Sequence, residues 1–332
     1  MKICCKELDV SEIKDYLRAD LVALHTGMRK YLGSDIALLN STNEGLLLHS
    51  GKHMRPILSL LMAKACSADG IVNENSIKYA VAAELLHNAT LLHDDVADSS
   101  DLRRGEPTLY KQMGPSISVL VGDFWLVRAM QAILDVSPRD DEAITLFSRT
   151  LSNLAEGEML QLQKAEKCDT SFEDYLAIIF RKTASLFQLS AMAGVMSMDA
   201  PAEYLAAAQD FGLYLGYAFQ MKDDIFDYMD SDVGKPVGVD ILEKKITLPL
   251  LGAFENAPRE LEMKIRDAVR TDPALCRDKV LEFVRSHEGI SQAQKVLNDY
   301  VRKAVDALKV LPDGKARRYL GELAEYTALR DI

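Results

Sequence analysis

Two short clusters of aspartates carry the strongest chemical signal in this 332-residue chain. The first reads D-D-V-A-D at residues 94–98, and the second reads D-D-I-F-D at residues 223–227. On a helix, residues three and four positions apart lie on one side, so the carboxylates of each cluster converge. Three like charges within one turn repel one another unless a counter-ion is present. Carboxylate oxygens suit Mg²⁺, which prefers to share its shell with water and substrate phosphates.

A solvated acidic face is the alternative interpretation of a single cluster in an acidic protein. Here, however, apolar helical sequence precedes both clusters, Leu91-Leu92 before the first and Tyr217-Ala218-Phe219 before the second. Solvated faces are not normally flanked by apolar residues on the same strip. The repetition therefore favours two metal-binding clusters over two solvated faces.

Basic residues lie close in sequence to both clusters, as a site for a metal-bridged polyanion requires. Arginine matches phosphate oxygens in a bidentate manner, and lysine supplies a mobile point charge. Taken singly, each basic group is more often a solvated surface charge, but the repetition beside each acidic cluster weakens that interpretation. The basic positions are Lys52 and Arg55, Arg103 and Arg104, and Lys235, Lys244 and Lys245.

One histidine shares a predicted helix with the first cluster. A single histidine on an apolar helix is more often a hydrogen-bonded core residue than a ligand. His87, however, precedes Asp94 by two turns, so the two share a face about 10.5 Å apart at the α-helical rise per residue. That separation leaves room for two diphosphates side by side. His93 points elsewhere and is expected to be structural.

Helices are the elements expected to position these residues. The ten prolines are thinly spread, residues 57–106 and 139–200 contain none, and the alternation typical of strands is absent. We therefore predict an all-α fold with one domain over residues 1–332, because no repeat or linker divides the chain. Expected helix starts are Ser137-Pro138, Asp272-Pro273 and the capping box Ser171 with Asp174, and expected stops are Gly33 and Gly114.

Composition narrows the function classes. The chain has a net charge of -11, with 48% hydrophobic and 27% charged residues, which is typical of a soluble globular protein and argues against nucleic-acid binding. Its five cysteines form no C-x-x-C pair, which predicts a cytoplasmic protein without a disulfide framework or a zinc ribbon. Lysines and acids interrupt the N-terminus before a signal-peptide stretch develops. The uncharged stretch at residues 183–198 is too short and too polar to span a bilayer and reads as a core helix.

Five strings together resemble the trans-isoprenyl diphosphate synthases, in particular the long-chain polyprenyl synthases of quinone biosynthesis, such as octaprenyl and heptaprenyl synthases. They are H-N-A-T-L-L-H-D-D-V-A-D, R-R-G-E-P-T, G-K-x-x-R-P, F-Q-M-K-D-D-I-F-D and G-K-P-V-G-x-D, and they lie between Gly51 and Pro249. The resemblance implies a helical bundle with a central cavity, a homodimer, and acidic clusters that face each other. It also implies a Mg²⁺-dependent head-to-tail condensation of isopentenyl diphosphate with an allylic diphosphate such as farnesyl diphosphate.

The same resemblance assigns roles to individual residues. Three Mg²⁺ ions on the allylic diphosphate are assigned to Asp94, Asp95, Asp98, Asp223, Asp224 and Asp227. The diphosphate of isopentenyl diphosphate is assigned to Lys52, Arg55, His87 and Arg104. The allylic diphosphate and the developing cation are assigned to Arg103, Lys182, Thr183, Gln220, Lys235 and Lys245, with Gln161 as a further polar residue. The expected catalytic set is Asp94, Asp95, Asp98, Arg103, Lys182, Thr183, Gln220, Asp223 and Asp224.

His53 departs from the resemblance, since it stands where relatives often carry a basic residue. A histidine there predicts a second diphosphate site that is either weakened or sensitive to pH near the ordinary titration range of histidine. Lys52 and Arg55 remain beside it, so binding itself is expected to be kept.

The predicted reaction is governed by charge on the leaving diphosphate. Fixed cations whose contacts strengthen as that charge develops lower the barrier, so a serine or cysteine nucleophile is not required. The released diphosphate can accept the proton lost after condensation, so a protein base is not required either. The Gly- and Pro-rich loop at residues 230–240 is expected to close over the site and exclude water.

Small residues before the first cluster favour a long product. Ala89 and Thr90 lie about one turn before Asp94, where short-product relatives carry bulky aromatic residues. Neither side chain blocks a growing chain, so the floor of the pocket is expected on the helix at residues 116–134. The candidates for that floor are Phe124, Trp125 and Met130.

Two alternatives remain open at this point. A short-chain farnesyl or geranylgeranyl synthase would need a floor formed by Phe124 or Trp125. A non-catalytic subunit of a heteromeric synthase would be expected to have lost aspartates or the arginine pair, and all are present. Terpene cyclases share the fold but lack a paired D-D-x-x-D. Membrane contact is expected to be at most transient, for release of the product.

Overall fold

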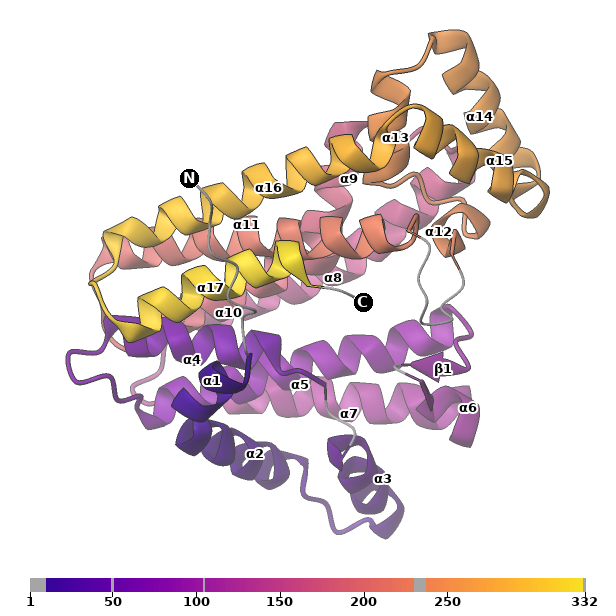
Figure 1. The fold of residues 1–332 in the computed structure, drawn as a ribbon. Helices are drawn as coiled ribbons and strands as arrows, with labels where there is room; N and C mark the ends of the chain where they lie inside the picture. Colours follow the sequence, from indigo (N-terminus) through magenta and orange to yellow (C-terminus); the bar gives the residue numbers. More distant parts are fainter. Residues whose placement is uncertain (1–9, 49–50, 104, 230–236, 331–332) are drawn as a thin grey trace. The chain divides into compact units, whose positions relative to one another are not determined.

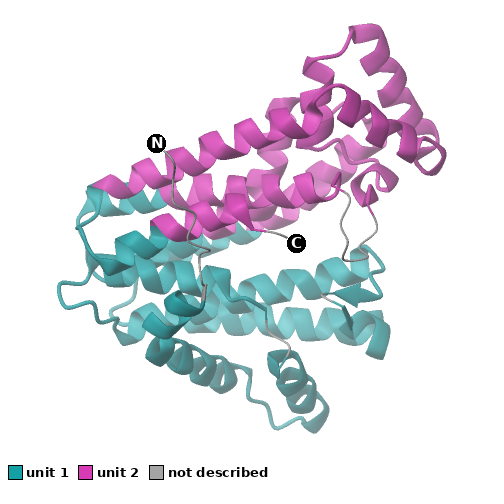
Figure 2. Ribbon diagram, viewed as in Figure 1, with its two compact units in different colours: residues 1–151, 189–209, 310–320 teal, residues 152–188, 210–309, 321–332 magenta. Residues whose placement is uncertain are grey.

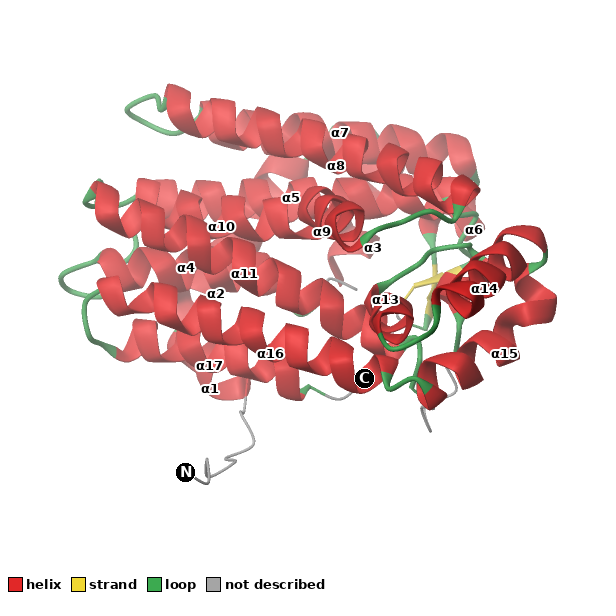
Figure 3. Cartoon of the chain, turned by 90° about the horizontal axis from the view of Figure 1, so that it is seen from above, coloured by secondary structure: helices red, strands yellow, loops and turns green. Residues whose placement is uncertain are grey.

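The computed structural model describes residues 10–48, 51–103, 105–229 and 237–330. Of these residues, 80% are helical, and the only strands among them are β1 (Leu102–Arg103) and β2 (Glu106–Pro107), which pair antiparallel (Figure 3). The absence of strand-like alternation in the sequence thus predicted the fold class, and the all-α prediction is confirmed.

The chain divides into two compact units, each assembled from three segments (Figure 2). Unit 1 comprises residues 1–151, 189–209 and 310–320, and unit 2 comprises residues 152–188, 210–309 and 321–332. Four long helices, α8, α10, α11 and α17, contribute residues to both units. The single domain over the whole chain stays a prediction.

The helices of unit 1 are α1 (Val10–Tyr16), α2 (Arg18–Leu32), α3 (Ala37–Leu48), α4 (Met54–Cys66), α5 (Glu74–Ala97), α6 (Leu109–Met113) and α7 (Pro115–Leu134), with parts of α8 (Asp141–Lys167), α10 (Ser185–Met196), α11 (Ala202–Phe226) and α17 (Lys315–Leu329). Unit 2 holds the remainder of those four helices. It also holds α9 (Phe172–Ile179), the π-helical turn η1 (Phe180–Ala184), α12 (Val239–Leu242), α13 (Leu248–Glu255), α14 (Arg259–Thr271), α15 (Pro273–Ser286) and α16 (Gly289–Ala307). The 3₁₀ turn η2 (Leu308–Val310) precedes α17.

Helix α5 is the centre of unit 1. It packs against α2, α4 and α7, and α5 and α7 lie side by side (Figure 1). Six consecutive residues, 81–86, are buried, so α5 is covered on several sides. The indole of Trp125 in α7 donates to Asn43 Oδ1 in α3 at 2.8 Å, and Asn43 Nδ2 donates to the Leu32 carbonyl of α2 at 2.8 Å. These buried bonds tie α3 to both α7 and α2.

Most predicted helix boundaries are confirmed. The capping box of Ser171 and Asp174 opens α9, and Asp272 caps α15 by accepting from the Leu275 amide at 3.0 Å. Gly33 follows α2, and Gly114, with a φ of 83°, separates α6 from α7. Such a left-handed φ strains residues that carry a Cβ.

The expected start at Ser137-Pro138 is wrong, because α8 begins at Asp141. Asp140 Oδ1 accepts from the Ala143 amide at 2.9 Å and supplies the cap instead. The Ser137 amide is used elsewhere, in a hydrogen bond to Asn75 Oδ1 at 3.3 Å. Asp140 therefore occupies the capping position that was expected of Ser137.

The expected core helix at residues 183–198 is present as the end of η1 followed by α10, with Phe187 and Leu189 fully buried. Among the described residues, α7 is the one helix long and apolar enough to cross a membrane by length and composition. A core helix of a soluble protein passes the same test; α7 packs against α5, and 39% of its apolar window is buried.

Candidate active site

Both acidic clusters lie at the C-terminal end of a long helix. Helix α5 ends at Ala97 and α11 ends at Phe226, so the first two aspartates of each cluster occupy the last helical turn. The C-terminal end of a helix carries a partial negative charge, which disfavours carboxylates there. Since each cluster adds several carboxylates at that position, a cation at either helix end would offset both repulsions.

The first cluster combines one paired aspartate with two more accessible ones. Asp95 is 3% exposed, and Arg103 of β1 approaches its Oδ1 with Nη2 at 2.7 Å and Nε at 2.8 Å. Asp94 is half-buried, and Asp98 is exposed. The structure thus brings Arg103 to the cluster beside which the sequence predicted it, and leaves Asp98 open to solvent.

The residues assigned to the second diphosphate lie on two helices of unit 1. Lys52 is exposed just before α4, and Arg55 is half-buried in the first turn of α4. His87 is half-buried in the middle of α5, two turns before Asp94. Two further predicted residues, Arg104 and Lys235, lie outside the described residues.

A π-helical turn carries two predicted residues of unit 2. The segment η1 interrupts the path from α9 to α10 and contains Lys182 and Thr183. A Cβ on Gly157 of α8 would lie 2.7 Å from Arg181 Cβ, and one on Gly216 of α11 would lie 2.5 Å from Ala184 Cα. Because both positions lack a side chain, α8 and α11 approach η1 closely. Such turns are rare and are frequent at functional sites.

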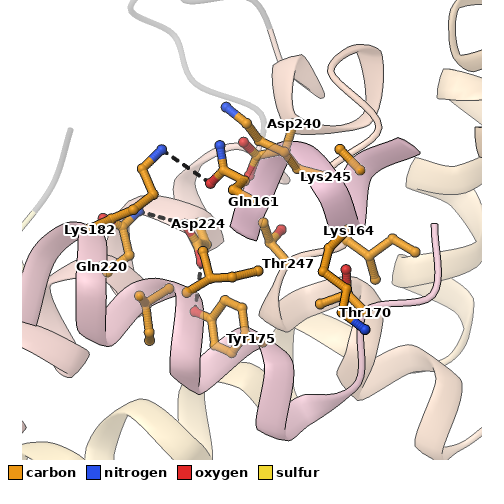
Figure 4. Close-up of a pocket in the computed structure, with 14 residues that line it drawn as sticks. Gln161, Lys164, Thr170, Tyr175, Lys182, Gln220, Asp224, Asp240, Lys245 and Thr247 are labelled. Carbon is orange, nitrogen blue, oxygen red and sulfur yellow. Dashed lines mark hydrogen bonds between the residues drawn. The ribbon is translucent and has the colours of Figure 1, made fainter. Parts of the chain in front are cut away.

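A cavity of about 120 Å³ in unit 2 collects several of the predicted residues (Figure 4). Lys182 Nζ lies 2.7 Å from Glu158 Oε1 and donates to Gln161 Oε1 at 3.2 Å. Two of these three residues, together with Gln220, Asp224, Asp240 and Lys245, line the cavity. The structure therefore gathers the predicted Gln161, Lys182, Gln220, Asp224 and Lys245 around one space.

A continuous row of hydrogen bonds runs along this cavity. Thr183 Oγ1 donates to Gln220 Oε1 at 2.7 Å, and Gln220 Nε2 donates to Asp224 Oδ1 at 2.9 Å. Tyr175 Oη donates to the other oxygen of Asp224 at 2.6 Å, and Figure 4 shows Tyr175 and Gln220 meeting at this carboxylate. These hydrogen bonds thus link Thr183, Gln220 and Asp224 into one network.

Burial dominates the electrostatics of Asp224. It raises the pKa of this carboxyl to about 6, although the hydrogen bonds from Tyr175 and Gln220 act in the opposite direction. The negative charge of Asp223 also raises this pKa, and Lys245 lowers it. A buried carboxylate with a raised pKa lacks sufficient positive charge around it, so its donor chemistry fits a hard divalent cation.

The other two aspartates of the second cluster have separate partners. Asp227 accepts the backbone amides of Val239 and Asp240, each at 3.0 Å, one on each carboxylate oxygen. Asp227 therefore ties the end of α11 to the start of α12. Asp223 Oδ1 accepts from Arg330 Nη2 at 2.6 Å, and the same guanidinium lies over the Phe219 ring at 4.1 Å.

Within the described ranges, no group of three or more histidine, cysteine, aspartate or glutamate side chains converges closely enough to hold a metal ion. The fit to a cation rests instead on the carboxylates at the two helix ends and on the raised pKa of Asp224. The metal-binding roles of Asp94, Asp95, Asp98, Asp223, Asp224 and Asp227 stay predictions.

Sequence reasoning missed three residues in contact with the second cluster or lining its cavity: Tyr175, Asp240 and Arg330. Asp240 ends the G-K-P-V-G-x-D string and was available from that motif. Tyr175 and Arg330 lie 49 and 107 positions from their aspartate partners, and no local signal marks them.

The residues expected to set product length lie on α5 and α7. Ala89 is buried, and Thr90 is half-buried with its hydroxyl donating to the His87 carbonyl at 2.8 Å. Trp125 is buried and held by Asn43, whereas Phe124 is half-buried beneath Arg128 at 4.7 Å. Met130 is half-buried, and residues 230–236 of the predicted closing loop lie outside the described residues.

Comparison with known proteins identifies the family. Residues 36–285 match the family described as Polyprenyl synthetase. The chain is 33% identical to octaprenyl diphosphate synthase of Haemophilus influenzae, over 96% of each chain. It is 37% identical to all-trans-nonaprenyl-diphosphate synthase (geranyl-diphosphate specific) of Rhodobacter capsulatus, over 92% of this chain and 93% of that protein.

The fold is also that of solved synthases. A crystal structure of polyprenyl synthase from Caulobacter crescentus, complexed with calcium and isoprenyl diphosphate, has a TM-score of 0.87 and 34% identity. The match covers 98% of this chain and 99% of that one. The chain therefore belongs to the polyprenyl synthetase family, the trans-isoprenyl diphosphate synthases, and is a prenyltransferase of the long-chain type.

Proposed function

We propose that the chain condenses isopentenyl diphosphate head-to-tail with an allylic diphosphate such as farnesyl diphosphate, in a Mg²⁺-dependent reaction. The product is a long-chain polyprenyl diphosphate suited to the side chain of a quinone. The observation that carries this proposal is the pair of aspartate clusters, each at the negative end of a long helix and each accompanied by phosphate-matching cations. The Caulobacter relative, solved with calcium and isoprenyl diphosphate, supports a divalent cation and this class of substrate.

The metal sites follow from the environment of each carboxylate. In the first cluster, Asp94 and Asp98 would be ligands, with Asp95 oriented by Arg103. In the second cluster, Asp224 and Asp223 would be ligands, and three Mg²⁺ ions per site are expected. Bound Mg²⁺ would neutralise the charge that develops on the leaving diphosphate.

The polar row in unit 2 would align the allylic end of the substrate. Glu158 and Gln161 hold the Lys182 ammonium at the cavity, where it would contact the diphosphate. The bonds from Thr183 through Gln220 fix both ends of the Gln220 amide and leave Asp224 oriented by two donors. Such preorganisation lowers the cost of arranging dipoles when charge develops.

Lys52, Arg55 and His87 would bind the diphosphate of isopentenyl diphosphate. The first two lie at the start of α4, and His87 lies on α5, which also carries the first acidic cluster. The proton released after condensation would pass to the departed diphosphate, so no protein carboxylate is needed as a base.

We also propose a cytoplasmic homodimer. Support for self-association comes from α7, whose apolar side chains include Leu120 at 67% and Val127 at 64% exposure. An exposed apolar strip of this kind is typical of an interface between copies. The five cysteines without a disulfide pattern support the location. A shift of the purified chain to monomer by Val127→Asp in size-exclusion chromatography would support this interface, and an unchanged dimer would contradict it.

The function is tested by incubating the purified chain alone with labelled isopentenyl diphosphate and farnesyl diphosphate. We expect incorporation of label in the presence of Mg²⁺, its loss with a chelator and its return when Mg²⁺ is restored. Turnover that requires a second protein would instead support the non-catalytic subunit, and metal-independent turnover would contradict the role given to the aspartates.

A further inference from the structure

Two histidines and a glutamate form a hydrogen-bonded row in unit 1 beside the residues assigned to the second diphosphate. His53 Nδ1 lies 2.9 Å from Glu84 Oε1, and His53 Nε2 lies 3.2 Å from His25 Nε2. The Glu84 side chain is 4% exposed and that of His53 is 10% exposed, whereas His25 lies on the surface of α2. The row therefore runs from a buried carboxylate to solvent through three elements, α5, the start of α4 and α2.

The proton positions in this row follow from the acceptors. An ionised carboxylate only accepts, so His53 Nδ1 must carry the proton that it donates to Glu84. Only one of the two facing Nε2 atoms can carry a proton while His53 and His25 remain bonded. The intact row therefore holds at most one imidazolium, and protonation of both rings would place two N–H groups against each other.

The central residue of this row, His53, has an unusual backbone conformation. His53 precedes α4 with a φ of 53° and a ψ of 38°, in the left-handed region that is disfavoured for residues with a Cβ. The Ile57 amide donates to the His53 carbonyl at 3.0 Å and so begins the helix there. Lys52 precedes His53 and Arg55 follows it in the first turn of α4. The hydrogen bond between His53 and Glu84 therefore fixes the backbone that carries both of these cations.

Charge links the row to both sides of the second diphosphate site. Burial acts to raise the pKa of Glu84, but the hydrogen bond and charge of His53, followed by the charge of Arg55, outweigh it and lower that pKa. Glu84 is therefore an ionised, buried carboxylate that needs these partners. Glu84 also lies three residues before His87 on α5, so it connects the α4 cations with His87.

We propose that Glu84, His53 and His25 are positioning residues that set the affinity for isopentenyl diphosphate by fixing the start of α4. This inference rests on the proposed function and goes beyond it by assigning residues that do not touch the substrate. Because the row lies away from the acidic clusters in sequence, its loss should raise the KM for isopentenyl diphosphate while kcat and the KM for the allylic substrate change little.

The test compares three side-chain removals with one rescue and one control. His53→Gly removes the imidazole without imposing a strained backbone, since glycine tolerates the left-handed region. Glu84→Gln removes the charge, and His25→Ala removes the outer ring at an exposed site. His53→Arg restores a cation beside Glu84, and Thr26→Ala is a matched control at an exposed neighbour on α2.

We expect His53→Gly and Glu84→Gln to raise the KM for isopentenyl diphosphate about tenfold, the size expected for losing a hydrogen bond to a charged group. His25→Ala should raise it about threefold, on the same physical basis and with the smaller loss expected of an exposed contact. His53→Arg should recover most of the affinity, and Thr26→Ala should match the wild type. Circular dichroism and melting temperature identify a variant that fails to fold, and His25→Ala then carries the test, since its site is exposed.

The pH profile separates positioning from a merely structural role. The charged groups around the row are His25 and Arg29 of α2, Arg55 of α4 and Glu84 of α5. Burial lowers the pKa of His25, with further lowering by the charges of His53 and Arg29. The wild-type KM for isopentenyl diphosphate should therefore rise at acidic pH, where protonation of His25 places its charge beside that of His53, and His25→Ala should reduce that rise.

An unchanged KM in the folded variants, or an equal rise in the KM for both substrates, would overturn the inference. A wild-type chain without any prenyl transfer would instead contradict the proposed function. The two failures are distinguishable because the first is measured against an active wild type.

Discussion

The two acidic clusters share a spacing and a position at the end of a long helix, but their surroundings differ. In the first, Arg103 binds Asp95 while Asp94 is half-buried and Asp98 is exposed. In the second, Asp224 is buried between two hydrogen-bond donors, and both oxygens of Asp227 accept backbone amides. The same aspartate spacing therefore has a partly exposed setting in unit 1 and a buried, hydrogen-bonded setting in unit 2.

This difference shows that a repeated motif need not repeat its chemistry. An exposed carboxylate such as Asp98 can rotate to meet an arriving ion, whereas Asp224 is already oriented by Tyr175 and Gln220. Asp227 holds α12 against α11 and has fewer lone pairs left for a metal. We infer that the carboxylates of the first cluster adjust when a metal-bound diphosphate binds, whereas those of the second cluster are already oriented.

The largest expected effect is the loss of Asp94, a predicted metal ligand of the first cluster. Asp94→Ala should lower kcat about a thousandfold or more, because the leaving diphosphate would lose charge neutralisation. The helical signal in far-ultraviolet circular dichroism should stay unchanged. Asp101→Ala, which removes an exposed acid of the same unit that pairs with exposed Lys111, is the control. Unchanged activity of Asp94→Ala would contradict the metal assignment.

Asp224→Asn should lower kcat about a hundredfold, because the charge of one oriented carboxylate is lost and only one of the two donors, Gln220 or Tyr175, keeps an oxygen acceptor. Steady-state kinetics at saturating Mg²⁺ measures this value. A loss as large as that of Asp94→Ala would indicate that the two clusters contribute equally, and would break the contrast between them.

The buried position of Asp224 also predicts a pH dependence of stability in metal-free protein. Its pKa is about 6 in the folded chain against 3.8 for the ordinary value, so the folded state binds more protons between these values. Stability should therefore fall as pH rises from about 4 to about 6, by on the order of 2–3 kcal/mol from this group. Urea unfolding of wild type and Asp224→Asn isolates the difference, and parallel profiles would argue against the burial of an ionised Asp224.

Asp227 and Asp98 occupy the same motif position, and their asparagine variants should behave oppositely. Asp227→Asn should cost about 1–3 kcal/mol of stability, because one backbone amide loses its acceptor. Asp98→Asn should leave stability nearly unchanged, since this side chain is exposed, but lower the affinity for Mg²⁺. Thermal unfolding and Mg²⁺ titration measure the two effects. Equal stability losses would remove the structural distinction.

The smallest effect on rate is expected from a change of product length. Ala89→Phe should shorten the products, because a ring at this buried position would block a tail that runs along α5 from the first cluster. Overpacking is expected to cost about 1–3 kcal/mol of stability. Ala89→Val should give an intermediate length. Unchanged products in folded Ala89→Phe would mean that the tail runs elsewhere.

Local sequence signals predicted the helices and the acidic clusters. The thin spread of proline predicted a helical fold, which is confirmed. The cap at Asp272 and the capping box at Ser171 depend only on neighbours within one helical turn, and both are confirmed. The start of α8 was predicted wrongly because Asp140 competes with Ser137 as a cap. Position in the sequence does not decide which of two nearby acceptors a helix uses.

The surroundings of the clusters depend on tertiary contacts that sequence spacing does not encode. Tyr175 reaches Asp224, and His25 reaches His53, only after helices distant in sequence have packed together. The π-helical turn at Lys182 likewise adjoins the close approach of α8 at Gly157 and α11 at Gly216. The motif therefore predicts which residues act, and the packing determines how differently they are held.

The most direct test of the account is the length of the product made by the purified wild-type chain from farnesyl diphosphate, labelled isopentenyl diphosphate and Mg²⁺. Reversed-phase chromatography of the dephosphorylated products measures it. We expect one dominant polyprenol longer than geranylgeraniol, because the small residues before the first cluster leave the tail path open. Products that end at geranylgeraniol, or no product longer than the farnesyl primer, would contradict this expectation.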